Sequence, residues 1–139
     1  MKTTAKIALC FVTSALALAQ SVTAAANPQV VVDVFKEVSA NVKAADIEKL
    51  AARFDSSVEL LLPGVEKTCT ARQAAVLLQE FFVRYKPTDF AALHVGGKSD
   101  KHYGIGLLTT PGGRFRTTIF LQLKGSSYII QQLRIEHDL

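Results

Sequence analysis

The fold is decided by residues 90–137, which read FAALHVGGKSDKHYGIGLLTTPGGRFRTTIFLQLKGSSYIIQQLRIEH. Four apolar runs rich in Ile, Leu, Phe and Thr are separated here by three short segments that contain Gly, Pro and Ser. Apolar runs broken by turn residues are typical of strands joined by hairpins. We therefore predict a meander of four strands with these bounds: Phe90–Val95, His102–Thr110, Arg114–Leu123 and Tyr128–His137.

The third of these runs has one apolar and one largely polar face, which is the pattern of a strand that is buried on one side only. The first face holds Phe115, Thr117, Ile119, Leu121 and Leu123. The second face holds Arg114, Arg116, Thr118, Phe120 and Gln122. We expect the first face to pack against helices and the second to lie on the outside of the sheet.

The fourth run needs one extra residue to keep its apolar side chains together. Under strict alternation, Tyr128 and Ile130 lie on one face, whereas Leu133 and Ile135 lie on the other. A one-residue bulge at Gln131-Gln132 would bring all four to the same face. The bulge also predicts a ladder with these partners: Leu123 with Tyr128, Leu121 with Ile130, Ile119 with Leu133, and Thr117 with Ile135.

The first 26 residues have the pattern of a secretory signal peptide. Two lysines precede an apolar segment at residues 7–18, and small residues allow cleavage after Ala19, Ala24 or Ala26. The apolar segment is shorter than the about 20 residues that a membrane span needs. We predict export to the periplasm or the medium and no stable membrane span after cleavage. An uncleaved anchor or a buried N-terminal helix are the alternatives.

The composition predicts one folded domain, residues 27–139. It does not favour binding to nucleic acid. The chain has 139 residues and a formal charge of +4, but Lys2 and Lys6 belong to the predicted leader. The mature chain then carries 14 basic against 12 acidic residues, with no dense basic cluster. Only Cys69 remains after cleavage, so an internal disulfide is excluded, and a lone Cys with no base beside it is typical of a small buried residue.

Three helices are predicted before the meander. The first spans about residues 28–42, starts at Asn27-Pro28 and has this buried stripe: Val31, Val34, Phe35, Val38 and Val42. The second starts near Asp46, buries Ile47, Leu50, Ala51 and Phe54, and ends at residues 55–57. After a short strand, Val58–Leu62, the third follows a capping box of Thr70 and Gln73 and stops before Pro87.

These elements predict an α+β fold, in which three N-terminal helices pack on a strongly bent mixed or antiparallel sheet with a C-terminal four-strand meander. Such a sheet, wrapped around helices, makes a cone with an open mouth. Gly104 and Gly106 lie in one strand, where they allow bending or close approach of another group.

The order of the elements resembles the nuclear transport factor two-like (ketosteroid isomerase/cystatin-like) fold, whose superfamily includes ketosteroid isomerase, scytalone dehydratase and many non-catalytic modules. More specifically, the chain resembles a family of secreted bacterial domains of unknown function with this fold. The stretches that carry the resemblance are FDSSVEL (54–60), LPG (62–64), YGIG (103–106) and IQQLRIE (130–136). The resemblance covers nearly the whole mature chain and implies a fold, export and a possible homodimer through the sheet, but no activity.

No constellation for catalysis or metal binding stands out. Enzymes of the superfamily use Asp, His and Tyr side chains in a pocket, whereas Glu59, Glu136 and Asp138 are expected to be exposed here. The histidines, His94, His102 and His137, lack the spacing of metal ligands. We therefore predict no catalytic residue, no metal and no cofactor.

Two sets of residues are candidates for binding. A bent sheet often encloses a pocket, and its candidate lining residues are Tyr85, His94, Phe115 and Thr117. His137 could join His94 at the mouth of the cone. On the outer face, the candidates for a protein interface are Arg114, Arg116, Phe120 and Arg134.

Three hypotheses about function follow. The first is an exported, non-catalytic module that binds a small molecule or a protein and forms a homodimer through its sheet. The second is an isomerase- or dehydratase-like enzyme, which requires a His or an acid inside the cone. The third is a structural or interaction module with a filled core, whose partner binds the outer arginine face or a sheet edge.

Overall fold

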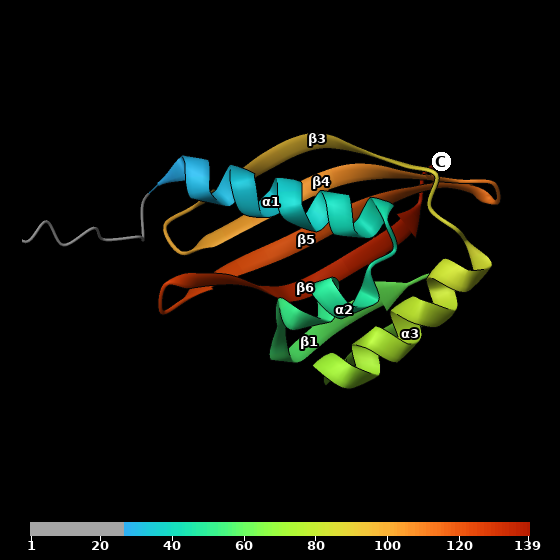
Figure 1. Cartoon of the computed structure of the whole chain (residues 1–139), viewed down its shortest axis with the longest axis horizontal. Helices are drawn as coiled ribbons and strands as arrows, with labels where there is room; N and C mark the ends of the chain where they lie inside the picture. The colour runs from blue at the N-terminus through green and yellow to red at the C-terminus, as the bar shows by residue number, and fades with distance from the viewer. Residues whose placement is uncertain (1–26) are drawn as a thin grey trace, which may run out of the picture.

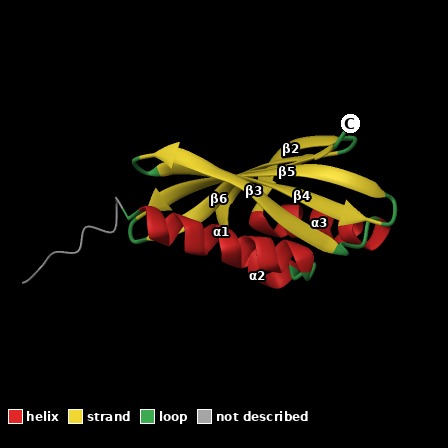
Figure 2. Cartoon of the chain, turned by 90° about the horizontal axis from the view of Figure 1, so that it is seen from above, coloured by secondary structure: helices red, strands yellow, loops and turns green. Residues whose placement is uncertain are grey.

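Three helices cover one face of a six-stranded curved sheet (Figures 1 and 2). The computed structural model describes residues 27–139, so the predicted leader and Cys10 lie outside the described residues. The helices are α1 (Pro28–Lys43), α2 (Ile47–Ala52) and α3 (Ala71–Arg84). The strands are β1 (Phe54–Leu62), β2 (Val65–Thr70), β3 (Asp89–Lys98), β4 (Lys101–Thr110), β5 (Gly113–Lys124) and β6 (Ser127–His137). In this part of the chain, no helix is long and apolar enough to cross a membrane.

The sheet is mixed, and its strand order is β2-β1-β6-β5-β4-β3. The predicted meander forms strands β3 to β6, each antiparallel to the next. The strand β1 lies parallel to β6, so the beginning of the domain is joined to its end in the middle of the sheet. We call the side that the helices cover the inner face, and the opposite side the outer face.

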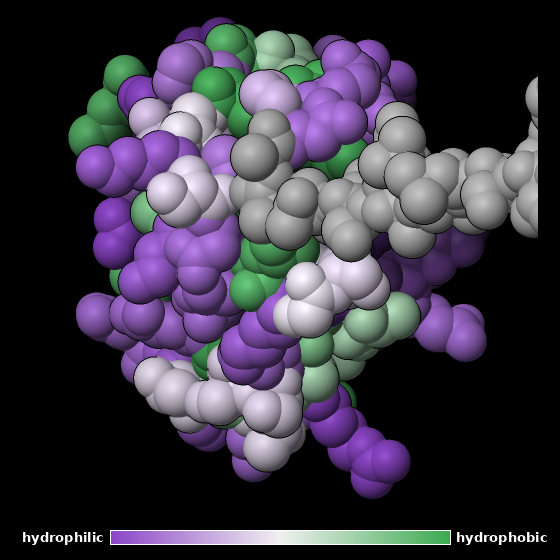
Figure 3. Space-filling view, turned by 90° about the vertical axis from the view of Figure 1, so that its left-hand side faces the viewer, coloured by the Kyte–Doolittle hydropathy of each residue, from purple (hydrophilic) through white to green (hydrophobic). Residues whose placement is uncertain are grey.

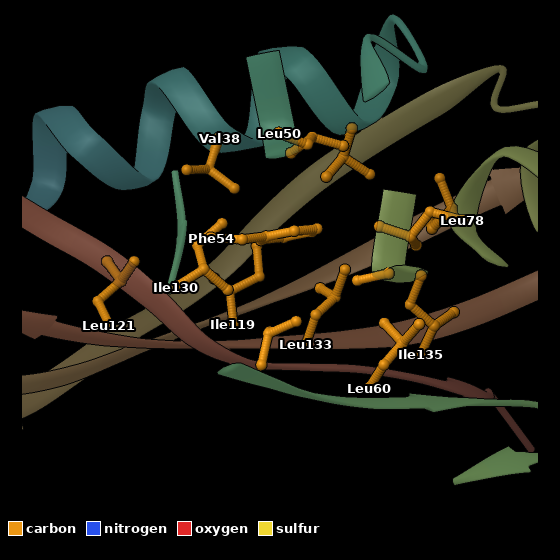
Figure 4. Packing of buried hydrophobic residues seen from close by; sticks show 14 of the residues in the cluster. Val38, Leu50, Phe54, Leu60, Leu78, Ile119, Leu121, Ile130, Leu133 and Ile135 are labelled. Carbon is orange, nitrogen blue, oxygen red and sulfur yellow. The ribbon is translucent and has the colours of Figure 1, made fainter. Parts of the chain in front are cut away.

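The predicted bulge in β6 is confirmed. Ile130 lies opposite Leu121 and Gln132 lies opposite Phe120, which leaves Gln131 as the extra residue. All four predicted pairs between β5 and β6 are present. As Figure 4 shows, Ile130, Leu133 and Ile135 point into the same core as Ile119 and Leu121. The bulge therefore keeps the apolar side chains of β6 on the inner face.

The helix starts agree with the predicted capping residues. The Asn27 side chain accepts a hydrogen bond from the backbone N–H of Gln29 at 3.0 Å, and Pro28 occupies the first turn of α1. At α3, Thr70 accepts from the N–H of Gln73 at 3.2 Å, and the Gln73 side chain accepts from the N–H of Thr70 at 3.1 Å. This reciprocal pair is the predicted capping box, and it ends β2 where α3 begins.

The predicted end of the second helix is wrong. The helix stops at Ala52, and Phe54 is the first residue of β1 rather than part of the helical stripe. The cause is pairing with β6, because the N–H of Ile130 donates to the Arg53 carbonyl at 2.7 Å and Phe54 lies opposite Ile130. Residues 55–57, which we expected to end a helix, therefore belong to a strand.

Strand β2 was not predicted from the sequence. This strand is at the edge of the sheet, and its sequence, VEKTCT, has only Cys69 buried. A polar edge strand gives little apolar periodicity, so it resembles a loop in the sequence. Cys69 lies opposite Val58 and is only 6% exposed, which confirms the prediction of a buried thiol.

Two glycines of β4 allow aromatic rings to lie directly on the sheet. A Cβ added to Gly104 would overlap the ring of Phe35 from α1, and one added to Gly106 would overlap the ring of Phe90 from β3. Both rings are at least 90% buried. The close approach that we expected at these glycines is thus present, and aromatic side chains fill the space between α1 and the sheet.

Candidate functional site

Three of the four predicted pocket residues lie on the inner side. Phe115 and Thr117 of β5 have 0% exposure. Tyr85, which follows α3, packs against Phe115 with 4.9 Å between ring centroids, and the His137 ring centroid lies 4.8 Å from that of Phe115. The structure therefore brings Tyr85 and Phe115 together in an aromatic cluster. Thr117 lies on the same face of β5 and is closed off from solvent.

His94 lies on the outer face, away from these residues. Strand β3 has an irregularity between Ala92 and His94, which places His94 opposite Ile105. Its ring lies 5.8 Å from that of Tyr103, and its Nε2 is 3.4 Å from the Tyr103 hydroxyl. The structure therefore does not bring His94 together with His137. The bulge at Leu93, between Ala92 and His94, was not predicted, because simple alternation places His94 on the same face as Phe90.

At the end of the inner side, α3 and the β1–β2 turn leave shallow hollows. Tyr85 lines one of about 160 Å³ together with Leu62, Leu77, Phe81 and Arg84, among others. An adjoining hollow of about 450 Å³ lies between the turn, residues 61–66, and residues 135–137 of β6. Neither hollow is lined by Phe115 or Thr117, so both are features of the rim rather than of the interior.

Thr117 offers a test of whether the interior is structural. Its hydroxyl is buried, and no hydrogen-bond partner for it is found among the described residues. A buried hydroxyl without a partner costs about 1–3 kcal/mol. Replacing Thr117 by Val removes the hydroxyl at nearly constant volume, so we expect T117V to raise the free energy of unfolding by about 1 kcal/mol. Urea unfolding of both proteins measures this change, and a loss of stability would show that the hydroxyl has a partner after all.

The outer face carries a row of side chains that crosses five strands. Tyr103 of β4 lies opposite Phe120 of β5, and Phe120 lies opposite Gln132 of β6. Gln132 lies opposite Glu59 of β1, which in turn lies opposite Thr68 of β2. We call these five residues the outer row. Its first half is aromatic and its second half is polar.

The polar half of the outer row lies in a hollow of about 340 Å³. We call this the polar hollow, and its lining residues are Ser57, Glu59, Thr68, Phe120, Gln131 and Gln132. It lies where two irregularities meet, because β6 bulges at Gln131 and the pairing of β1 with β6 shifts between Phe54 and Glu59. Bulges are often found beside functional sites, where they redirect side chains.

The polar hollow was not predicted from the sequence, although the sequence contains part of the signal. The predicted bulge turns both Gln131 and Gln132 toward the face that carries Phe120. The parallel pairing of β1 with β6 was not predicted, and without it Glu59 could not be placed beside these glutamines.

The four predicted interface residues come from β5 and β6. The Arg114 guanidinium lies 3.6 Å from the Asp138 carboxylate, and Arg116 lies opposite Glu136 in the ladder. Arg134 lies opposite Thr118, and its Nε is buried with no partner among residues 27–139. Since two of the three arginines face acids, these residues form a mixed surface rather than a basic patch, and Phe120 is the apolar member.

A fourth hollow, of about 340 Å³, lies at the end of the molecule where α1 begins. Figure 3 looks onto this end, where hydrophilic residues predominate and smaller apolar patches lie between them. His102 is one of its lining residues, and a ring nitrogen of His102 is within hydrogen-bond distance, 2.9 Å, of the Ser99 carbonyl. Because the His102 ring already interacts with the backbone of the same turn, we regard this hollow as structural.

The shifted pKa values lie outside the outer row. A hydrogen bond from Lys124 holds the pKa of Asp55 below its usual 3.8, and burial raises the pKa of the Cys69 thiol above its usual 9.0. Both shifts have a structural cause. In the described part of the chain, no group of three or more His, Cys, Asp or Glu could hold a metal ion.

The Asp55–Lys124 pair predicts a dependence of stability on pH. The two atoms, Oδ2 and Nζ, are 2.8 Å apart, and the Asp55 side chain is 15% exposed. Because the folded pKa is lowered, the pair stabilises the protein above the unfolded pKa, and this is lost as the pH falls through the folded pKa. We expect D55N to lower the free energy of unfolding by about 0.2–1 kcal/mol at pH 7 and not below that pKa. Unfolding at a series of pH values, with K124Q as the matched variant, measures this; an effect of D55N that is independent of pH would contradict it.

Comparison with known proteins gives a family and a fold. The family model described as "Domain of unknown function (DUF4783)" matches residues 35–136. A DUF4783 family protein from Bacteroides ovatus is 28% identical, with 73% of this chain and 93% of that one covered and a TM-score of 0.70. One from Bacteroides fragilis is also 28% identical, with 73% and 95% covered and a TM-score of 0.69. No curated protein matches.

A more distant structure has the same fold. A candidate ketosteroid isomerase from Kribbella flavida is 14% identical, with 77% of this chain and 76% of that one covered and a TM-score of 0.56. At this identity the likeness concerns the fold alone, and it agrees with the resemblance seen in the sequence.

Proposed function

The chain belongs to the DUF4783 family and has the nuclear transport factor two-like fold, and we propose that it is an exported, non-catalytic binding module whose ligand lies on the outer face of its sheet. The observation that carries the proposal is the contrast between the two faces. The inner face is closed by side chains such as Phe35 and Phe115, with 1% and 0% exposure. The outer face carries the aromatic and polar side chains of the outer row.

The inner face supports the non-catalytic part of the proposal. An isomerase- or dehydratase-like reaction needs an ionisable group next to a substrate inside the fold. On the inner face of β5 the side chains are Phe115, Thr117, Ile119 and Leu121, all at most 2% exposed. They leave a substrate neither space nor an acid or base along this strand. The leader pattern in residues 1–26 supports export.

Pairing of two copies through the same face is the second candidate. Ile105 and Leu107 of β4 and Phe120 of β5 are only half-buried on this face. Arg116 and Glu136 lie side by side there, so a two-fold axis could bring each of them to its opposite charge in the other copy. This candidate predicts a dimer that is weakened by F120A, which sedimentation velocity measures.

The main proposal is tested by binding to the envelope of the cells that export the protein. The mature chain, residues 27–139, is mixed with sedimented envelope fragments, and the bound fraction is compared among wild type, a Tyr103→Ala/Phe120→Ala double variant and T117V. We expect wild type and T117V to co-sediment equally and the double variant to bind at least tenfold more weakly. Equal binding of all three proteins, or binding by none, would contradict the proposal.

A further inference from the structure

We propose that the outer row binds a neutral oligosaccharide, with the polar hollow as its main subsite. The inference rests on the proposed function and names the class of ligand for that face. It begins from the composition of the row, which places two aromatic rings next to a group of amide, hydroxyl and carboxylate side chains.

The aromatic half offers stacking surfaces for sugar rings. The Tyr103 and Phe120 rings lie on adjacent strands with 6.2 Å between their centroids, and His94 continues the series at 5.8 Å from Tyr103. Gly96 makes room for this arrangement, because a Cβ there would lie 2.6 Å from the Tyr103 hydroxyl oxygen. One face of a pyranose ring consists mainly of C–H groups, and such a face packs well on an aromatic ring. The hydroxyl groups at the edge of the sugar ring then stay in water.

The polar half offers hydrogen bonds that the protein does not use itself. Within residues 27–139, the hydrogen bonds found involve none of the side chains of Gln131, Gln132 and Glu59. By contrast, Gln122 on the same face donates to Asp100 at 2.9 Å. An amide both donates and accepts, and a carboxylate accepts from two hydroxyls. A vicinal pair of sugar hydroxyls, each a donor and an acceptor, complements this set.

The polar hollow results from the backbone geometry of β6, which fixes the direction of its side chains. In a regular β6, Gln131 would point outward and Gln132 inward. The bulge gives both side chains to the hollow, where they meet Phe120 of β5 and Glu59 of β1. The two adjacent amides are therefore held on a rigid sheet rather than on a loop, which keeps the cost of ordering them on binding low.

Charge and shape favour a neutral glycan. Among residues 27–139, Glu59 is the only charged residue that lines the polar hollow, so a uronic acid or phosphate would be repelled there. The row runs across the strands from Tyr103 of β4 to Thr68 of β2, which at a strand spacing of about 4.8 Å is about 19 Å. A peptide that extends a sheet binds along an edge strand instead. A chain of several sugar units fits the length and the chemistry.

The test uses the same envelope fragments, treated chemically to remove one class of ligand at a time. Periodate cleaves vicinal diols of sugars, and protease removes proteins. We expect periodate to abolish binding of the mature protein and protease to leave it unchanged. A neutral glycan fraction released from the envelope should compete for binding, and the acidic fraction should not.

Variants then locate the site. F120A and Q132A are each expected to weaken binding of the neutral fraction at least fivefold by calorimetry. Val83→Ala, which also shortens an apolar side chain but on exposed α3, is the matched control and should bind as wild type does. Circular dichroism and thermal unfolding show whether each variant is folded.

The possible results separate the two proposals. If binding to the envelope needs Tyr103 and Phe120 but survives periodate and is lost with protease, the oligosaccharide proposal is overturned and the proposed function stands. If neither the wild type nor any variant binds to the envelope, both the proposed function and the oligosaccharide proposal are overturned. A dimer in sedimentation velocity that F120A dissociates would show that a second copy covers the face, and would also overturn the oligosaccharide proposal.

Discussion

Replacing Phe35 by Ala is expected to lower the free energy of unfolding by about 3–5 kcal/mol. Phe35 is 1% exposed, and its ring fills the space above Gly104 between α1 and the sheet. Removing the ring leaves a cavity in a rigid interior, which costs more than the lost transfer free energy alone. Lys36→Ala at the next, exposed position is the matched control and should change stability by less than about 0.5 kcal/mol.

Gly104 provides the second half of this test. Gly104→Ala alone should cost about 1–3 kcal/mol, because its Cβ would overlap the Phe35 ring and something must shift. In the Phe35→Ala background the same substitution should cost less, since the ring is gone. Urea unfolding of the four proteins gives the coupling. Additive effects would contradict the close packing of α1 on β4.

The second large effect concerns the bulge in β6. Leu133→Ala should lower the free energy of unfolding by about 2–5 kcal/mol, because Leu133 is 1% exposed and lies opposite Ile119. Gln132→Ala, at the adjacent residue on the outer face, should change it by less than about 0.5 kcal/mol. The comparison reports the register directly, since a regular strand would reverse the faces of these two residues. A larger loss from Gln132→Ala than from Leu133→Ala would contradict the bulge.

The meander could be predicted because its signals are local. Turn residues separate the four runs, and the alternation of β5 shows which side is buried. The bulge could be predicted from packing, because Tyr128, Ile130, Leu133 and Ile135 can share one buried face if the strand contains one extra residue. Burial of a whole face is a strong constraint on register.

The errors arose where local pattern and tertiary pairing disagree. Phe54 continues the helical spacing of Ile47 and Leu50, but its pairing with Ile130 of β6 makes it part of a strand. Strand β2 presents little apolar surface because it is an edge strand, so its pattern was too weak to detect.

The candidate site was the hardest part to predict, because it depends on residues that are far apart in the chain. Glu59 meets Gln132 only through the parallel pairing of β1 with β6, and that pairing has no signature in either segment. Two of the four pocket residues proposed from the sequence, Phe115 and Thr117, shared a face in the pattern of β5, but the pattern could not show that Phe35 and Phe90 fill the space above the sheet.

The central claim is that the ligand lies on the outer face, and NMR of isotope-labelled protein comprising residues 27–139 tests it most directly. The protein is titrated with the neutral glycan fraction of the envelope, and two groups of signals are followed. We expect shifts in the side-chain amide signals of Gln131 and Gln132 and in the ring signals of Phe120, with the methyl signals of Ile119 and Leu133 unchanged. Shifts confined to the inner methyl groups would place the ligand inside the fold and contradict the account.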